Sequence, residues 1–398
     1  MFPQQSRIPE GQKTKMIYGY IKDQRYDEAI RVLNQELNFC PKSRVMSLLG
    51  YCYYMAQDYL NASKVYEDLT YLYPNIDEYK LYYGQCLYKT GQYEDALKVS
   101  GAIQSKDYQK ELILLYAYIR YEMDELQHAK TLCQSFESES SFVTLEAAIL
   151  LKEGRFEESR NKFDYSKGIS GPSCELLYNL ALCHYRLKQY DKCMQYIAEI
   201  IEKGTREHPE LGVGTNSEQM PVASVGNTQA LKESALIEAF NLKAAIEYNL
   251  KNYQAAKEAL WDMPPRNEDE FDPVTLMNYA LMNMETDPSG GFKKLNFLLH
   301  SPPFPPESFA NLLLLYAKYQ YFDLAADVLA ENSDLTFKYI SEEDYEYIEA
   351  LIFQNSNPDE TVNKFVELGG RHVENLRRVT RQIKDAQVER DNDALKKA

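Results

Sequence analysis

The sequence predicts an all-α protein, a superhelix (α-solenoid) of tetratricopeptide repeats, in which a two-helix unit of about 34 residues is stacked in series. Three observations predict this fold: a recurring motif, a constant period between its copies, and glycines and prolines that keep the same period. The motif is a turn, an aromatic residue, two further residues and a small residue, as in "GQYEDA" from Gly91. It returns as "QDYLNA", "GRFEES" and "KQYDKC".

The small residue that ends each motif measures the period. Its copies are Ala29, Ala62, Ala96 and Ala129, spaced 33, 34 and 33, then Ser159 and Cys193 after 30 and 34, then Ala256 and Ala325 after wider gaps. We number each repeat so that this residue is position 20. A helix pair with this period cannot bury its apolar face alone, so stacked neighbours must share one continuous core.

Glycine and proline mark the two helices of each repeat. Gly50 and Gly84 lie twelve residues before an alanine of the series, where a missing side chain lets the second helix approach the first. Pro41 and Pro74 lie twelve residues after one, where a residue without an N–H ends the second helix. The aromatic residue of the motif should open the second helix.

We expect about ten units, divided into four segments. Residues 1–202 hold about six N-terminal repeats. Residues 203–229 form a flexible loop that is rich in Gly, Ser, Thr and Asn and has no apolar period. Residues 230–369 hold further, partly degenerate repeats, interrupted by the proline-rich "SPPFPPES". Residues 370–398 form a charged amphipathic helix with apolar residues at 3–4 spacing.

Composition excludes several classes of function. The net charge of −16 and the pI of about 5.0 argue against nucleic-acid binding, which requires clustered Lys and Arg. The longest apolar runs are too short to span a membrane. The first residues contain no apolar segment typical of a signal peptide, so we expect a cytosol-like compartment in which the seven cysteines stay reduced.

No catalytic motif is present, and we expect neither enzymatic activity nor a cofactor. Cys174, Cys183, His184 and Cys193 are the one group with metal-ligand chemistry. Cysteine also recurs at position 10 of the repeat, inside the first helix, which favours a small buried residue over a zinc ligand. We therefore predict no metal site.

Tyrosine recurs at positions 9 and 12 of the first helix, which share one helix face. In tetratricopeptide superhelices these positions line the concave groove. Tyrosine suits a peptide groove, because it combines a large apolar face with a hydroxyl group and few rotatable bonds. Inter-helix packing, as expected for Tyr20, Tyr53 and Tyr93, is the alternative. The predicted groove residues are Tyr18, Tyr51, Tyr54, Tyr88, Tyr118, Tyr121, Tyr185 and Tyr248.

Long stretches outside the repeat consensus are similar to one family. They include "MPPRNEDEFDPVTLMNYALMNM", "PFPPESFANLLLLYAKYQYFDLAADVLAEN" and "CELLYNLALCHYRLKQYDKCMQYIAEIIEKG". They resemble the fleer family, also called the tetratricopeptide repeat protein thirty family, of intraflagellar transport complex B. The similarity covers nearly the whole chain, although family members continue with further repeats beyond "DNDALKKA".

This resemblance implies a non-enzymatic scaffold of the cilium and cytoplasm, at the axoneme and ciliary base. It implies that the superhelix wraps an extended, proline-rich segment of another complex B subunit. It also implies links to cilium assembly, to the anterograde kinesin and to tubulin polyglutamylation. Two alternatives remain: an adaptor that recruits a tubulin-modifying ligase, and a generic peptide-binding chaperone cofactor.

Overall fold

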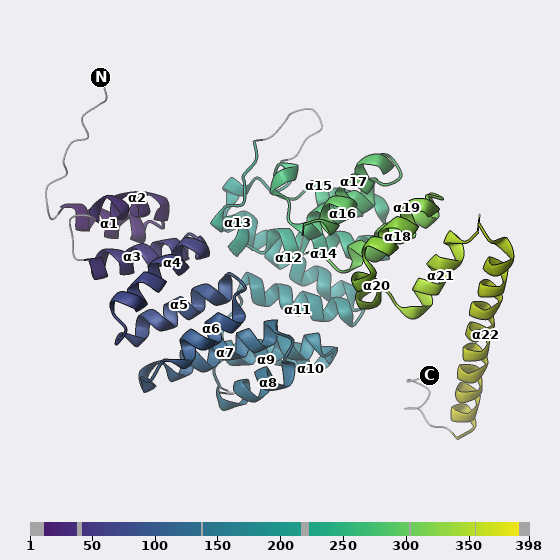
Figure 1. Ribbon diagram of the computed structural model, residues 1–398, viewed down its shortest axis with the longest axis horizontal. Helices are drawn as coiled ribbons and strands as arrows, with labels where there is room; N and C mark the ends of the chain where they lie inside the picture. The colour runs from purple at the N-terminus through teal and green to yellow at the C-terminus, as the bar shows by residue number, and fades with distance from the viewer. Residues whose placement is uncertain are drawn as a thin grey trace. The chain divides into compact units, whose positions relative to one another are not determined.

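The computed structural model describes residues 12–37, 42–136, 138–215, 223–301, 304–354 and 356–389. These residues form twenty-two α-helices and four short 3-10 helices, without a strand among them, which confirms the predicted all-α class (Figure 1). No helix in this described part is both long and apolar enough to cross a bilayer. Two compact units result: unit 1 is Met1–Leu211 with Asn227–Leu242, and unit 2 is Gly212–Gly226 with Lys243–Ala398.

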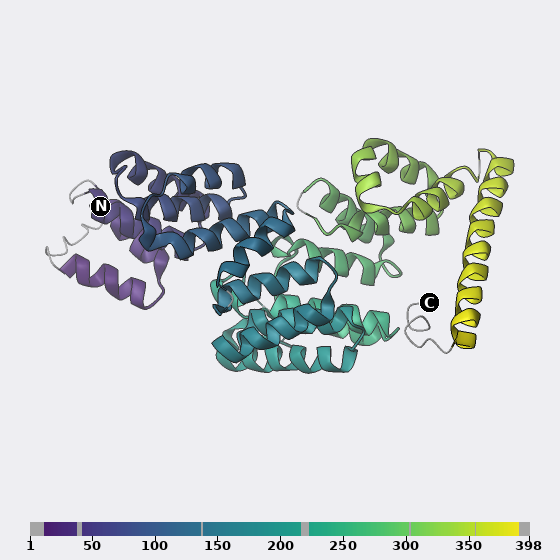
Figure 2. The ribbon, with the colours of Figure 1, turned by 90° about the horizontal axis from the view of Figure 1, so that it is seen from below.

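Unit 1 is a series of helical hairpins, and Figure 2 shows the consecutive antiparallel pairs from below. From α1 to α12, each odd-numbered helix is the first helix of a repeat and each even-numbered helix is the second. A short helix and the start of a seventh hairpin follow. The helices are α1 (Gln12–Lys22), α2 (Tyr26–Glu36), α3 (Lys42–Met55), α4 (Tyr59–Leu72), α5 (Asp77–Lys89), α6 (Tyr93–Gly101), α7 (Gln109–Glu122), α8 (Leu126–Cys133), α9 (Ser140–Lys152), α10 (Phe156–Ser170), α11 (Cys174–Arg186), α12 (Tyr190–Glu207), α13 (Gln229–Glu233) and α14 (Leu236–Asn249), the last continuing into unit 2.

The predicted register is confirmed at the small residue of each repeat. All eight residues of the series have no solvent exposure: Ala29, Ala62, Ala96, Ala129, Ser159, Cys193, Ala256 and Ala325. Five positions earlier, at position 15, the backbone has a φ between +57° and +79° in every one of these repeats. This left-handed residue ends the first helix and turns the chain into the second. Glycine fills position 15 only at Gly91 and Gly154.

The glycines of the first helices allow the close approach that their spacing predicts. A Cβ on Gly50 would lie 2.8 Å from the ring of Tyr66, and one on Gly84 would lie 2.3 Å from Ser100 Oγ. Tyr66 belongs to the second helix of the repeat that contains Gly50, and Ser100 belongs to the second helix of the repeat that contains Gly84. The first helix therefore needs a residue without a side chain at this position, because the partner side chain already fills the space.

Unit 1 also has a contact between repeats that are far apart in the sequence. Lys232 Nζ, on α13, donates to Gln57 Oε1 at 2.7 Å, at the turn between α3 and α4. The next residue, Glu233, lies near enough to Tyr26 to raise the pKa of its hydroxyl, after the larger effect of burial. The segment that leads into the seventh repeat thus lies beside the first and second repeats.

Unit 2 is also built of helix pairs, and two of its repeats have a different turn. Its helices are α15 (Tyr253–Trp261), α16 (Pro273–Asn283), α17 (Pro288–Leu299), α18 (Glu307–Lys318), α19 (Phe322–Glu331), α20 (Ser333–Tyr339), α21 (Glu342–Ile352) and α22 (Pro358–Glu389). In the repeats of the series, the N–H at position 20 donates to the carbonyl at position 16. The buried residues Gly291 and Thr361 make the same bond, to the carbonyls of Asp287 and Asn357. They lie 35 residues after Ala256 and 36 after Ala325, so the period persists where the motif is lost.

The segment predicted as a loop, residues 203–229, is partly regular. Helix α12 continues to Glu207. The Gly214 N–H donates to the Asp262 carbonyl at 2.9 Å, which holds one side of this segment to unit 2. Residues 216–222 lie outside the described residues, so the predicted flexibility of the segment stays a prediction there.

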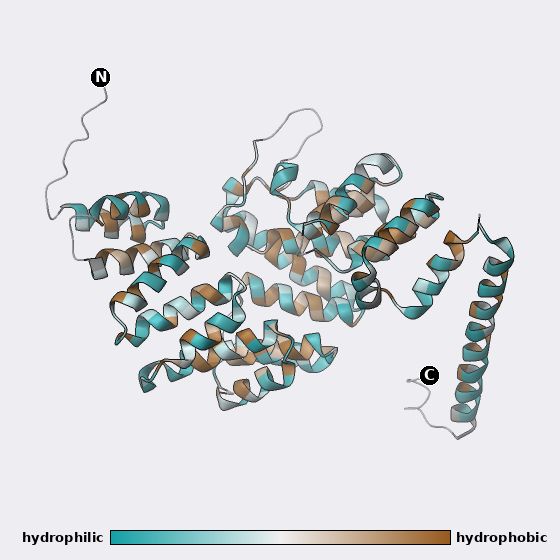
Figure 3. Ribbon diagram, viewed as in Figure 1, coloured by the Kyte–Doolittle hydropathy of each residue, from teal (hydrophilic) through white to brown (hydrophobic). Residues whose placement is uncertain are grey.

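The charged helix predicted from residue 370 is the second part of α22, which begins at Pro358. Figure 3 shows that most residues along this helix are hydrophilic. Its first turns pack on α21, where the rings of Tyr347 and Phe365 lie 5.9 Å apart. Further along, Leu376 is 67% exposed.

Candidate peptide-binding groove

The first helices of unit 1 line two hollows that contain predicted groove residues. A cavity of about 530 Å³ between α1 and α3 is lined by Tyr18. A cavity of about 410 Å³ between α3 and α5 is lined by Tyr51 and Tyr54, together with Tyr82. Tyr51 and Tyr54, at positions 9 and 12 of one repeat, therefore line the same cavity.

The ring at position 12 packs against the ring at position 17 in four repeats. Position 17 is the aromatic residue that opens the second helix. The ring centroids lie 5.2–6.2 Å apart in the pairs Tyr54–Tyr59, Tyr88–Tyr93, Tyr185–Tyr190 and Tyr248–Tyr253. These distances are typical of aromatic pairs, which restrict both rings. Tyr93, expected only in packing, therefore also supports a groove ring.

Tyr88 is the most connected of the predicted groove rings. It lies 6.0 Å from the ring of Tyr118, and Lys89 Nζ lies 5.5 Å from its centroid. Burial raises the pKa of Tyr88, with a further contribution from Glu122, so its hydroxyl stays neutral. In the next repeat Lys152 Nζ lies 4.8 Å from the centroid of the Tyr121 ring, within the range of a cation–π contact.

The eight predicted residues differ in exposure. Tyr18 and Tyr51 are 55% and 42% exposed. The other five predicted residues of unit 1 are half-buried: Tyr54, Tyr88, Tyr118, Tyr121 and Tyr185. Tyr248 is also exposed but belongs to unit 2, so it is not grouped with the other seven. Burial raises the pKa of Tyr54 to about 12, which keeps that hydroxyl neutral and able to donate a hydrogen bond.

Carboxylates at position 2 form a second row beside the rings, which the sequence prediction did not include. Tyr82 donates a hydrogen bond to Glu78 at 2.7 Å. Glu175 lies close enough to raise the pKa of Tyr118, two first helices away, after the larger effect of burial. Glu238 raises the pKa of Tyr178 on α11, again after the larger effect of burial. The signal was available in the sequence, since Glu recurs at one position of the repeat.

Cationic residues at position 13 occupy the other end of the first helices. They are Lys89, Lys152 and Arg186. Acidic groups near helix N-termini and basic groups near C-termini complement the helix dipole, which alone explains much of this pattern. The combination of aromatic faces with two oppositely charged edges can bind an extended peptide by stacking and by hydrogen bonds to its backbone.

The cysteine and histidine group does not form a metal centre in the described part of the chain, where no cluster of three or more such ligands occurs. Cys174, Cys183, His184 and Cys193 are all buried. Burial raises the pKa of Cys193 to about 12, so its thiol stays protonated. A protonated, buried thiol is a packing group and a poor metal ligand.

Comparison with known proteins identifies the family. Residues 308–398 match the model of the intraflagellar transport protein 70 C-terminal domain, and residues 46–220 match that of intraflagellar transport protein 56. Intraflagellar transport protein 70A of Xenopus tropicalis is 52% identical over 98% of this chain and 60% of that relative. The human protein 70A is 46% identical over 99% of this chain and 61% of that relative.

Among solved structures, a tetratricopeptide repeat protein from Parabacteroides merdae has a TM-score of 0.48 and 12% identity, over 68% of this chain and 97% of that one. The chain spans about three fifths of the length of the curated relatives. The repeat register and the sequence identity together confirm the resemblance, and over the part that it spans the chain belongs to the intraflagellar transport protein 70 family.

Proposed function

We propose that this chain is a non-enzymatic scaffold of intraflagellar transport complex B that retains an extended, proline-rich segment of another complex subunit. The observation that carries the proposal is the row of tyrosine rings at positions 9 and 12, three of which line cavities between successive first helices of unit 1. The family relationship supports a role in intraflagellar transport, and hence in the cilium.

Tyrosine rings and a proline-rich segment are complementary for a physical reason. A polyproline II helix is already extended and has few conformations to lose on binding, and aromatic grooves recognise it in several peptide-binding domains. The rings at position 12 are already restricted by their position-17 partners. Both sides of the interface are therefore organised before they meet, which reduces the entropy lost on binding.

In this proposal the scaffold supports cilium assembly, anterograde transport and tubulin polyglutamylation through the subunits that it holds. Its partners are other complex B subunits and, through them, the anterograde kinesin. Recruitment of a tubulin-modifying ligase is the alternative. The two differ in what the purified chain binds directly.

The test is a binding titration with the chain and each complex B subunit co-expressed singly, followed by synthetic peptides from any subunit retained. Tyr88→Ala with Tyr121→Ala should weaken binding at least tenfold, which is about 1.4 kcal/mol. The control pair Tyr71→Ala with Tyr165→Ala also removes two rings, which are 86% and 55% exposed on second helices, and should change binding less than twofold.

Circular dichroism of the same samples separates binding from folding. We call the row of tyrosine rings at positions 9 and 12 the tyrosine face. Normal binding by the Tyr88/Tyr121 variant, or an equal loss in the control pair, would exclude the tyrosine face as the binding surface. Retention of a tubulin-modifying ligase, with no complex B subunit retained, would favour the adaptor function.

A further inference from the structure

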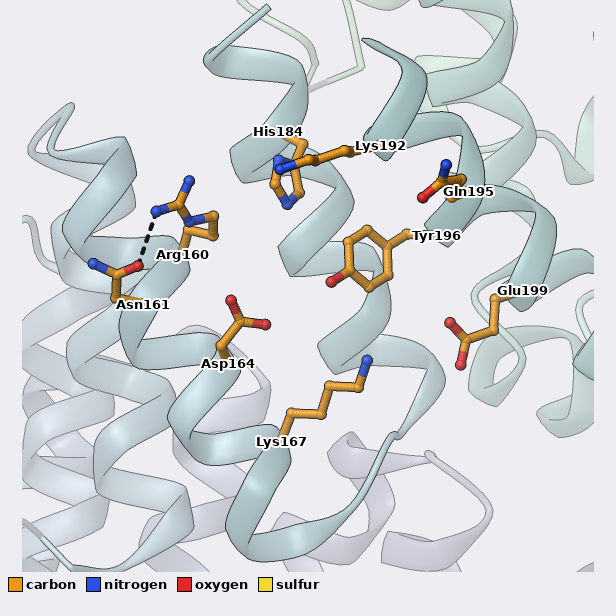
Figure 4. A pocket seen from close by; sticks show the side chains of 9 residues that line it. All are labelled: Arg160, Asn161, Asp164, Lys167, His184, Lys192, Gln195, Tyr196 and Glu199. Atoms are coloured by element: carbon orange, nitrogen blue, oxygen red, sulfur yellow. Dashed lines mark hydrogen bonds between the residues drawn. The ribbon is translucent and has the colours of Figure 1, made fainter. Parts of the chain in front are cut away.

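A further cavity of unit 1 lies between the second helices α10 and α12. Its volume is about 630 Å³, which is the size of a pocket for a small ligand or several peptide residues. Nine side chains from α10, α11 and α12 line it, and Figure 4 shows them around an open centre. Most of them are polar or charged.

The floor of this cavity is His184, which is only 4% exposed. Its ring stacks on that of Tyr196 with centroids 5.6 Å apart, and Nδ1 donates to Gln189 Oε1 at 2.8 Å. These contacts hold the ring in place and leave its other nitrogen, Nε2, directed at the open centre (Figure 4). Within the described residues this nitrogen has no hydrogen-bond partner. Because Nδ1 is the donor, Nε2 is a hydrogen-bond acceptor, so the cationic side chains beside the ring, and not the ring itself, are the groups that can bind an anion.

The walls carry charges that are not paired with one another. Arg160 and Lys192 approach His184 from α10 and α12, and in Figure 4 the Lys192 side chain extends over the ring toward Arg160. Neither forms an ion pair with another described residue. Arg160 instead donates to the neighbouring Asn161 side chain at 3.0 Å. Two cations are therefore directed at one part of the cavity, and neither is paired with the carboxylates of Asp164 and Glu199 that line the same cavity.

The remaining charges divide the cavity into two parts. Asp164, one helical turn after Arg160 on α10, lies on the same side as that cation (Figure 4). Lys167 and Glu199 line the far part, where Lys167 Nζ lies 5.1 Å from the centroid of the Tyr196 ring. The complete lining has three cations and two carboxylates, against a net charge of −16 for the chain. The part around His184 is thus a local cationic site on an acidic protein.

We propose that this cavity is a second binding site, which takes the carboxylate of an acidic side chain from an extended segment of a partner protein. The carboxylate lies between Arg160 and Lys192, above His184. The amides of Asn161 and Gln195 are placed to bond the main chain of the same segment (Figure 4). The size of the cavity favours a peptide, because one small anion would fill only part of it.

Fluorescence anisotropy of the whole chain with a fluorescein-labelled hexaglutamate peptide tests the proposal at 0.15 M salt. At this ionic strength the distant negative charges of the chain are screened within about 8 Å. Arg160→Gln with Lys192→Gln should weaken binding at least tenfold. The control pair Arg31→Gln with Lys64→Gln removes the same charge from exposed positions on α2 and α4, and should change it less than twofold.

A third variant should change the peptide affinity in the opposite direction. Asp164→Asn removes a carboxylate that repels the ligand and should tighten binding about threefold, without loss of helicity. Unlabelled hexaglutamate should displace the probe, whereas hexaglutamine and inorganic phosphate of equal ionic strength should not. Displacement by phosphate would show a small-anion site and overturn the peptide proposal. Equal losses in the two pairs, weaker binding by Asp164→Asn, or no binding at all would overturn it as well.

Discussion

Units 1 and 2 have the same repeat period, but unit 1 turns the chain in one way and unit 2 in two ways. Lys251 and Gln320 of unit 2 keep the positive φ of unit 1, while two other repeats do not. In unit 1 the residue at position 15 has a positive φ, and an aromatic or leucine residue opens the second helix. In two repeats of unit 2, Asp287 and Asn357 occupy position 16 and proline follows at position 17. The side chain of Asp287 accepts from the Gly290 N–H at 2.9 Å, which caps the helix directly.

This difference also removes an aromatic ring. A proline at position 17 starts a helix well, because its φ is already helical and it has no N–H to leave unpaired. It cannot, however, support a ring at position 12 as Tyr93 supports Tyr88. The tyrosine face is therefore a property of the repeats with the left-handed turn, and the capped repeats maintain the stack without it.

The two units also differ in ionisable core residues. All seven cysteines and most of the tyrosines precede residue 200. Burial raises the pKa of Tyr54 and Tyr178 to about 12 and that of Cys52 to about 11. The core of unit 2 consists mainly of Phe292, Phe309 and leucines, which do not ionise, and Tyr316 is the one fully buried tyrosine among the described residues of that cluster. The comparison can therefore be tested by pH as well as by substitution.

The largest expected effect is alkaline unfolding of unit 1. A buried tyrosine with a raised pKa stabilises the folded state below pH 10, and this contribution disappears as the pH rises to about 12. Brief subtilisin digestion at pH 8 and pH 11, mapped by mass spectrometry, should show new cuts in residues 42–136 before residues 304–354.

A pair of single substitutions tests the cause of that effect. Tyr66→Phe removes the hydroxyl of a residue that is 3% exposed and should reduce the alkaline sensitivity. Tyr71→Phe removes the hydroxyl of a residue that is 86% exposed and should have no effect. Earlier cleavage of unit 2 would show that tyrosine ionisation does not determine the order.

The next effect in size is overpacking at position 20. Ala96→Phe should destabilise the chain by about 3 kcal/mol, because the residue has no exposed surface and its space is filled by neighbours. Gly291→Phe should have a similar effect in unit 2, where even a Cβ would lie 2.2 Å from Met284 Sδ. Thermal melts measure both.

Ala102→Phe is the control, since Ala102 is exposed just after α6. It should change the melting temperature little. A loss only at Ala96 would mean that Gly291 is not the position-20 residue of its repeat, and that the two units do not share one register.

The smallest expected effect distinguishes the two kinds of turn. Lys188 has a φ of +57°, so Lys188→Gly should stabilise unit 1 by about 0.5 kcal/mol, through relief of left-handed strain. Thr286 is at the same repeat position in a capped turn. Thr286→Gly should destabilise unit 2 by a similar amount, because glycine makes the unfolded chain more flexible and there is no left-handed strain to relieve. Denaturant midpoints measure both changes in stability. Two changes of the same sign would refute the distinction between the two kinds of turn.

The sequence by itself determined the helical hairpins, the register and the face on which the tyrosines lie. Each depends on residues close together in the chain, such as Gly84 and Ala96, whose spacing places them at one contact between two consecutive helices. The same local rule placed Tyr51 and Tyr54 on one helix face. Gly291 and Thr361 were missed because their turns replace the aromatic residue with proline, although the period of the chain continues through them.

Tertiary structure alone decided the contacts between distant repeats. The bond from Lys232 to Gln57 spans 175 residues and depends on the small rotation that every repeat adds to the superhelix. The cavity between α10 and α12 depends on how far two second helices diverge, which is set by packing on α11 and not by either helix alone. Residue spacing encodes a helix face, since a helix has one period, but the sum of many small packing angles exists only in the folded chain.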